Sequence, residues 1–220
     1  MVDFVRQRQA MVDGQIRVND VTDPRIIETM LALPREQFVP RSRVDLAYID
    51  EDIEIREAFG AAPARYLMEP MTLARLVQAL EIKPEDRALV VGCATGYSAA
   101  LLARLAGEVI ALESEEALAK EARRIVKQRN VTFVNGALNA GWPYSAPYNA
   151  ILIDGSVEFV PEVITSQLAD GGRLVAVVGR GRAAKALLHV KSGGVVSARP
   201  LFDAAIPALP GFARPPQFVF

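Results

Sequence analysis

The spacing of hydrophobic positions changes near residue 85, and this change divides the chain into two parts. Before it, apolar residues recur at helical spacing in the stretches 4–16 and 24–31. Asp23 and Pro24 are suited to be the N-cap and first residue of the second helix. We therefore expect an N-terminal helical cap that also includes a substrate loop, residues 1–84, followed by a second domain, residues 85–220.

After residue 85, short apolar runs alternate with amphipathic stretches, a pattern typical of a parallel sheet covered by helices on both faces. The stretch 114–129 predicts a helix, with Ser114 as N-cap, glutamates in the first turn and cations in the last. Residues 183–190 fit a helix or a strand. The fold class is thus α/β, a doubly wound, mostly parallel, Rossmann-like sheet. Its expected strands are 87–91, 108–112, 131–134, 150–153, 173–179, 194–202 and a closing strand at 215–220.

Residues 45–70 are acidic at first and then small and irregular, which favours a surface loop over a regular element. Loops of this kind often contain functional residues.

Composition limits the classes of partner. The net charge is −1, which gives no reason to expect nucleic acid or an anionic membrane surface as a partner. No apolar run is long enough to span a bilayer, and the N-terminus lacks a signal-peptide core. Cys93 and His189 are the single cysteine and histidine, so a disulfide within the chain and a metal site built from several such residues are excluded. We expect a cytoplasmic protein without a metal.

A glycine-containing turn follows the first expected strand. In a parallel sheet, ligands bind beyond the carboxyl ends of the strands, and the turn with Gly92 and Gly96 predicts free backbone N–H groups there. Glu113 ends the next strand about 20 residues later, where an acid can bind ribose hydroxyls. The alternative for Glu113 is a solvated acid that caps the next helix. NAD is disfavoured because Tyr97 replaces the third fingerprint glycine, and ATP because no G-K-[ST] follows.

Asp154 ends another expected strand, where it can hold an amine or cap the following helix, and we favour the cap. For Trp142 we expect packing of its turn, and for His189 a partly buried structural position. A reactive thiol at Cys93 is unsupported.

Several segments in order along the chain together resemble the protein-L-isoaspartate O-methyltransferase family. The resemblance extends to about residue 179, and each segment is weak alone. It implies an S-adenosylmethionine-dependent methyltransferase fold and transfer of methyl groups to isoaspartyl carboxylates in damaged proteins. The segments are M-V-D-G-Q-I (11–16), D-P-R-I-I-E-T-M (23–30), P-R-E-Q-F-V-P (34–40), A-Y-I-D-E-D (47–52), E-P (69–70), G-C-A-T-G-Y-S-A-A-L-L-A (92–103), G-W-P (141–143), A-P-Y-N-A-I-L-I (146–153) and L-A-D-G-G-R-L-V (168–175).

The resemblance implies a set of cofactor-binding positions. Those on the methionine and ribose side of S-adenosylmethionine are Gly92, Cys93, Ala94, Gly96 and Glu113, and those bordering the adenine are Gly136, Ala137 and Leu138. Two of these positions and Val90, just before the glycine turn, depart from the family pattern. Val90 replaces an acid, Ala94 the middle glycine and Ala137 an aspartate. Each of the two replaced acids removes an acceptor for the cofactor, which weakens binding by on the order of 1 kcal/mol.

The acceptor loop departs further. Where the family has G-Q-T-I-S-Q-P, residues 64–70 are A-R-Y-L-M-E-P, so Met68 replaces the serine near the transferred methyl and Glu69 the glutamine. For Met68 we favour packing on the core over catalysis. Glu69 would repel an isoaspartyl carboxylate unless Arg65 neutralises it or its side chain points away. The expected function is isoaspartyl methylation; the alternatives are a catalytically degenerate binding or regulatory protein, or a methyltransferase with another acceptor.

Overall fold

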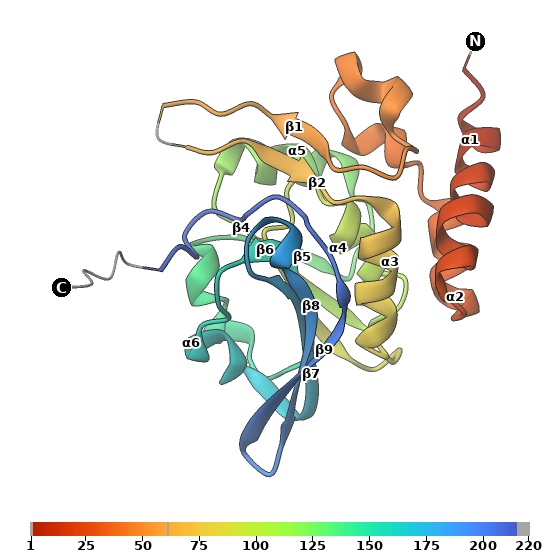
Figure 1. Cartoon of the computed structure of the whole chain (residues 1–220). Helices are drawn as coiled ribbons and strands as arrows, with labels where there is room; N and C mark the ends of the chain where they lie inside the picture. The colour runs from red at the N-terminus through yellow and green to blue at the C-terminus, as the bar shows by residue number, and fades with distance from the viewer. Residues whose placement is uncertain (1, 61, 215–220) are drawn as a thin grey trace.

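A seven-stranded sheet forms the centre of the protein, whose computed structural model describes residues 2–60 and 62–214 (Figure 1). The strand order is β5-β4-β3-β6-β7-β8-β9. The pairs from β5 to β7 are parallel, and β8 and β9 continue the sheet in antiparallel pairs. The strands are β3 (Arg87–Val91), β4 (Glu108–Glu113), β5 (Val131–Asn135), β6 (Tyr148–Val157), β7 (Leu168–Val178), β8 (Lys185–Ser192) and β9 (Val195–Asp203). The expected doubly wound, mostly parallel sheet is confirmed.

The alternating side chains of the strands supply two apolar layers. On β3, Ala88 and Val90 belong to one buried cluster, and Leu89 and Val91 to the other. The first cluster also contains side chains of α3 (Pro70–Ala79), α4 (Tyr97–Leu102), α5 (Glu116–Ile125) and the N-terminal cap. The second contains Ile164 of α6 (Glu162–Thr165), with Leu138, Leu209 and Phe212 from irregular segments. The C-terminal segment therefore helps to cover one face of the sheet.

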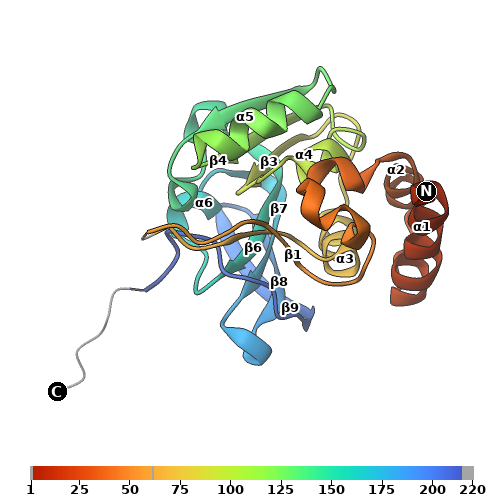
Figure 2. The ribbon, with the colours of Figure 1, turned by 90° about the horizontal axis from the view of Figure 1, so that it is seen from above.

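The N-terminal cap contains two helices, α1 (Phe4–Met11), continued by a π-helical turn (Val12–Ile16), and α2 (Pro24–Ala32) (Figures 1 and 2). Asp23 is the N-cap of α2 and its carboxylate accepts from the backbone N–H of Arg25 at 2.9 Å, as expected. Short 3-10 turns make up much of the remaining irregular chain: Arg17–Asn19, Arg35–Phe38, Arg41–Leu46, Leu138–Ala140, Pro143–Ser145 and Gly181–Ala183.

The structure corrects two expectations about elements and decides between the two alternatives for a third. Residues 45–70 contain a two-stranded hairpin, β1 (Ile53–Arg56) and β2 (Arg65–Leu67), because their short runs alternate buried and partly exposed side chains. The N-cap of α5 is Glu115, not Ser114, because the backbone N–H of Ser114 is turned back to the carboxylate of Glu113. Residues 183–190 lie mostly within the strand β8. The strand expected at 215–220 lies outside the described residues.

A substitution at Gly96 tests how tightly the turn after β3 packs. Gly96 has φ +96°, and an added Cβ would lie 2.8 Å from Cγ2 of Val126. We expect Gly96→Ala to lower the free energy of unfolding by about 1–3 kcal/mol, measured by urea denaturation. Gly14→Ala is the control, because nothing lies within 4 Å of its added Cβ, and its unfolding free energy should stay within about 1 kcal/mol of the parent value. Equal losses in the two variants would contradict the prediction.

Candidate active site

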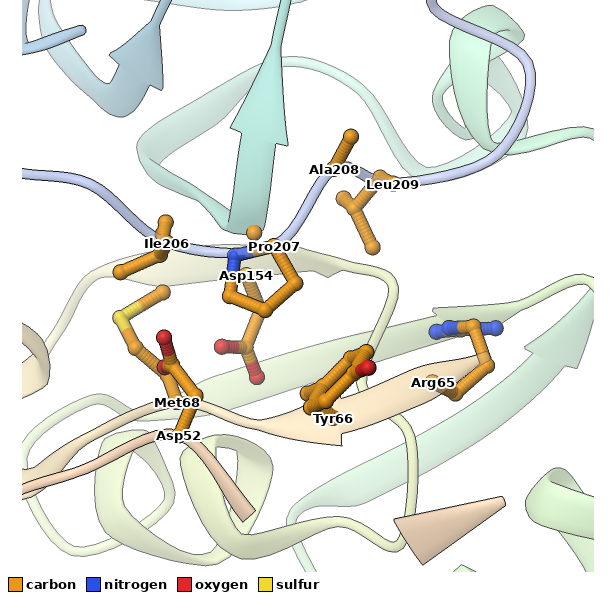
Figure 3. A pocket seen from close by; sticks show the side chains of 10 residues that line it. Asp52, Arg65, Tyr66, Met68, Asp154, Ile206, Pro207, Ala208 and Leu209 are labelled. Atoms are coloured by element: carbon orange, nitrogen blue, oxygen red, sulfur yellow. The ribbon is translucent and has the colours of Figure 1, made fainter. Parts of the chain in front are cut away.

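The candidate site lies beyond the carboxyl ends of β3, β4 and β6, where the strand order reverses between β3 and β6. The β1–β2 hairpin crosses this edge of the sheet from one side, and the chain after β9 crosses it from the other (Figures 2 and 3). Between them remains a cavity of only about 10 Å³, with Asp52, Met68 and Asp154 in its lining. This is the space of about one water molecule.

Arg65 and Glu113 form a buried ion pair at the end of β4. Arg65 donates from Nη1 to Oε1 of Glu113 at 2.7 Å and from Nη2 to Oε2 at 2.9 Å. The exposed fractions of the two side chains are 2% and 0%. Nη1 of Arg65 also donates to Oε1 of Glu115 at 3.1 Å, and Arg56 on the opposite hairpin strand pairs with Oε2 of Glu115 at 2.6 Å. The two arginines therefore fix the hairpin to the turn after β4.

The remaining hydrogen bonds of Glu113 come from the backbone. Ala94 N donates to Oε2 at 2.8 Å, while the N–H groups of Ser114 and Glu115 donate to Oε1 at 2.8 and 3.1 Å. Burial opposes the charged carboxylate, but the hydrogen bonds and charge of Arg65 outweigh it and hold the pKa of Glu113 below its usual value. Glu113 is thus an ionised group whose two oxygens together accept five N–H bonds within the chain.

The N–H groups of the turn after β3 are also largely used within the protein. The N–H groups of Gly92 and Cys93 both donate to the carbonyl of Leu112, and that of Gly96 donates to the carbonyl of Cys93. With Ala94 bound to Glu113, the expectation of free donors is wrong for these four residues. Ala94 has φ +51°, a left-handed conformation that a glycine adopts at lower cost. Burial raises the pKa of the Cys93 thiol, which keeps it protonated and unreactive.

The segment 206–212 lies over this turn and over the end of β6. Cδ2 of Leu209 lies 2.9 Å from where a Cβ on Gly92 would stand, and its Cγ lies 2.6 Å from the same point on Gly155. Ser156 fixes the segment, because its N–H donates to the carbonyl of Pro207 at 2.9 Å and its carbonyl accepts from Leu209 N at 2.8 Å. Figure 3 shows Leu209 facing the hairpin strand that contains Arg65.

Two carboxyl groups line the cavity. Burial is the main cause that raises the pKa of Asp52 to about 7 and that of Asp154 to about 6. Asp154 accepts from the hydroxyl of Ser98 on α4 at 2.5 Å. It does not cap a helix, because β6 continues to Val157 and α6 has Pro161 as its N-cap, so the favoured expectation for Asp154 is wrong.

Arg35 lies fully buried near these acids. Its Nε donates to the carbonyl of Ala47 at 2.8 Å and its Nη2 to the carbonyl of Met68 at 2.7 Å. Its guanidinium carbon lies 4.8 Å from the ring centroid of Tyr97. Arg35 thus joins the N-terminal cap to the acceptor loop.

The two acceptor-loop residues lie in different surroundings. Met68 is 4% exposed and packs in the core, as expected. Glu69 accepts from the hydroxyl of Thr72, and burial raises the pKa of its carboxyl. Arg65 is paired with Glu113 and Glu115 instead of neutralising Glu69. Glu69 therefore keeps its hydrogen bond within the first turn of α3.

The positions expected beside an adenine lie after β5. The N–H of Gly136 donates to the carbonyl of Glu113 at 3.1 Å, and Ala137 precedes the 3-10 turn that begins at Leu138. Leu138 is buried in the same cluster as Leu209. Trp142 packs its turn as expected, with its ring edge-to-face on Tyr144 at 5.0 Å. His189 is partly buried on β8, also as expected.

Sequence reasoning missed three features of this site. Asp52 and Arg35 stand in segments with no ligand-binding pattern, and Leu209 comes from a proline-rich stretch that predicts only irregular structure. For Arg65, the only partner expected from the sequence is Glu69. The sequence shows acids at Glu113 and Glu115 and arginines at Arg56 and Arg65, but these opposite charges do not indicate which side chains pair.

Comparisons with known proteins agree on one family. The sequence model of "Protein-L-isoaspartate(D-aspartate) O-methyltransferase (PCMT)" matches residues 6–204. The chain belongs to the protein-L-isoaspartate O-methyltransferase family. A relative of that name from Roseiflexus sp. (strain RS-1) is 36% identical over 196 residues, 88% of this chain and 86% of its own length. Another from Methanoculleus marisnigri is 35% identical over 199 residues, 89% of this chain and 88% of its own.

Solved structures share the fold. One titled protein-L-isoaspartate O-methyltransferase has a TM-score of 0.80 at 24% identity. The match covers 93% of this chain and 66% of that chain. A second, from Plasmodium falciparum, is described as a putative enzyme of this kind in complex with S-adenosyl-L-homocysteine. It has a TM-score of 0.74 at 20% identity, with 92% of this chain and 97% of that chain covered.

The site in this conformation does not have room for a nucleoside cofactor. The acid and glycine turn are of the right chemical type. However, both oxygens of Glu113 are bound to Arg65, and Leu209 lies against Gly92 and Gly155. Within residues 2–60 and 62–214, no group of three or more His, Cys, Asp or Glu side chains is placed to hold a metal ion. In the same ranges, no helix is both long and apolar enough to cross a membrane.

The raised pKa values predict a pH dependence of stability. Folded Asp52 keeps its proton up to a pKa of about 7, whereas its ordinary value is 3.8. The folded state thus binds the extra proton between these values, and its stability must fall as the pH rises from about 4 to 7. We expect the melting temperature, measured by circular dichroism, to drop by a few degrees over this range.

Asp52→Asn is the control for this dependence. The amide oxygen can still accept from the N–H of Glu69, which Asp52 binds at 3.0 Å, but the side chain no longer titrates. The melting temperature of the variant should change less between pH 5 and 8. Parallel curves for the variant and the parent would show that Asp52 is not responsible.

Proposed function

We propose that this chain is an S-adenosylmethionine-dependent methyltransferase that acts on isoaspartyl carboxylates of damaged proteins in the cytoplasm. The observation that supports this best is that the acceptor loop and the expected cofactor positions meet at one edge of the sheet. Met68, Arg65 and Asp154 line the same cavity, and Arg65 contacts Glu113 directly. A transfer between two bound molecules needs the two sites to be adjacent in this way.

In this proposal, Gly92, Cys93, Ala94, Gly96 and Glu113 face the methionine and ribose part of the cofactor. Gly136, Ala137 and Leu138 border the adenine. When bound, S-adenosylmethionine supplies the methyl group as a sulfonium. Met68 and Glu69 stand at the acceptor positions, where the chain's own contribution is to orient the peptide and exclude water. The cytoplasmic location is supported by the single cysteine, which is buried and free.

A second candidate function is a family member that binds a partner without methyl transfer. The observation in its favour is the complete use of Glu113 by Arg65 and backbone N–H groups. A third candidate function is methyl transfer to a different acceptor, in which Glu69 and Asp154 favour a cationic or hydroxyl-bearing group.

Binding and turnover distinguish these functions. We expect calorimetric titration with S-adenosylhomocysteine to give weak but measurable binding, and labelled S-adenosylmethionine to methylate an isoaspartyl peptide slowly. The same peptide with ordinary aspartate is the control and should stay unlabelled. No heat at millimolar ligand would remove the enzyme functions, whereas binding without transfer to the isoaspartyl peptide would favour another acceptor or a binding role.

Substitutions that restore the residues typical of the family should strengthen both cofactor binding and methyl transfer. Ala94→Gly relieves the left-handed conformation of an alanine, and Ala137→Asp adds an acceptor beside the expected adenine. We expect the two together to tighten S-adenosylhomocysteine binding by about tenfold. Met68→Ser with Glu69→Gln should raise the rate of isoaspartyl methylation. If affinity is unchanged in the first double variant, these positions do not contact the cofactor.

A further inference from the structure

We infer that the chain closes its own cofactor site with an internal plug, formed by Arg65 and residues 206–212, and that S-adenosylmethionine binds only in competition with it. This inference rests on the proposed function, because it concerns the same site. The closed form of the site depends on specific side-chain contacts, and single substitutions can remove these contacts one at a time.

Leu209 is the first component of the plug. Its side chain fills the space above Gly92 and Gly155, the two glycines at the ends of β3 and β6, and approaches Leu138 within one buried cluster. Gly92 and Leu138 are also proposed cofactor positions. A ligand that touches both has to move Leu209, which is only 8% exposed.

Arg65 is the second component. A ribose diol that binds Glu113 needs the carboxylate oxygens as acceptors, and both are held by Nη1 and Nη2 of Arg65. The guanidinium supplies a positive charge as well as two parallel hydrogen bonds, which neutral hydroxyls cannot match. Arg65 therefore competes with the ligand for the same two atoms.

The plug is held mainly by side-chain contacts, with Leu209 and Phe212 buried in the second apolar cluster and with few backbone bonds. Residues 206–212 are not part of the seven-stranded sheet and are held to β6 by the two backbone bonds with Ser156. Arg65 stands at one end of a hairpin that has three paired positions. The match to the family model ends at residue 204, so this segment lies outside the part of the chain that the family model describes.

A purely structural role makes a different prediction from a plug. If residues 206–212 only cover the sheet, removing Leu209 lowers stability and leaves ligand affinity unchanged. If they compete with the ligand, the same change raises affinity, because the ligand no longer displaces a buried side chain.

The first test compares Leu209→Ala with Leu201→Ala in the full chain. Leu201 lies partly buried on β9, outside the residues that line the cavity, and loses the same atoms. Affinity for S-adenosylhomocysteine is measured by calorimetry and by the fluorescence of Trp142, the single tryptophan, whose ring lies beside Gly136. We expect about tenfold tighter binding for Leu209→Ala and the parent affinity for Leu201→Ala.

The second test compares Arg65→Leu with Arg56→Leu. Both arginines belong to the hairpin and pair with Glu115, but only Arg65 contacts Glu113. We expect Arg65→Leu to tighten binding by at least tenfold and Arg56→Leu to leave it unchanged. Arg65→Leu leaves Glu113 buried without its counter-ion and can fail to fold. In that case the comparison of Leu209→Ala with Leu201→Ala still tests the plug.

Two results would overturn the plug. One is a folded Leu209→Ala variant with the parent affinity, and the other is equal gains in the test and control variants. The proposed function fails separately: plug-free variants that bind S-adenosylhomocysteine tightly but never methylate the isoaspartyl peptide would leave the plug intact and remove the activity.

Discussion

The buried ion pair between Arg65 and Glu113 fixes how the β1–β2 hairpin meets the carboxyl end of β4. Glu113 ends a central strand, and its carboxylate organises the turn after β3 through Ala94 as well as the start of α5 through Ser114 and Glu115. Arg65 brings the hairpin of the N-terminal half onto this point. A buried carboxylate without a counter-ion is costly, so the conformation of the hairpin and that of the glycine turn depend on one another.

The second cluster of apolar side chains depends on the end of the chain in a similar way. The face of the sheet opposite α3, α4 and α5 has the single short helix α6 among the described residues, and Leu209 and Phe212 complete its covering. The same side chain that finishes this core lies in the proposed ligand site. Stability and ligand access are therefore opposed at Leu209, whereas most small-molecule sites are largely pre-formed.

The fold could be predicted from the sequence because its signals are local and repeated. Buried strands such as β3 and β4 are continuous apolar runs, and the Asp23-Pro24 pair marks the start of α2 by its own chemistry. The site was harder to predict from the sequence, because its main contacts join residues far apart in the chain. Arg65 and Glu113 are 48 positions apart, and nothing in either local pattern indicates their pairing. The hairpin was missed since its strands have only four and three residues, too few for a clear alternation.

The position of Leu209 also has a consequence for the order of folding. During synthesis, the strands β3 and β4 and the hairpin are complete long before residue 209 is added. N-terminal parts of a chain can begin to fold while the rest is still being made. Until residue 209 is added, the growing chain lacks the side chain that fills the space at Gly92 and Gly155. Closure of this space therefore depends on the segment 206–212, which the chain adds after β9.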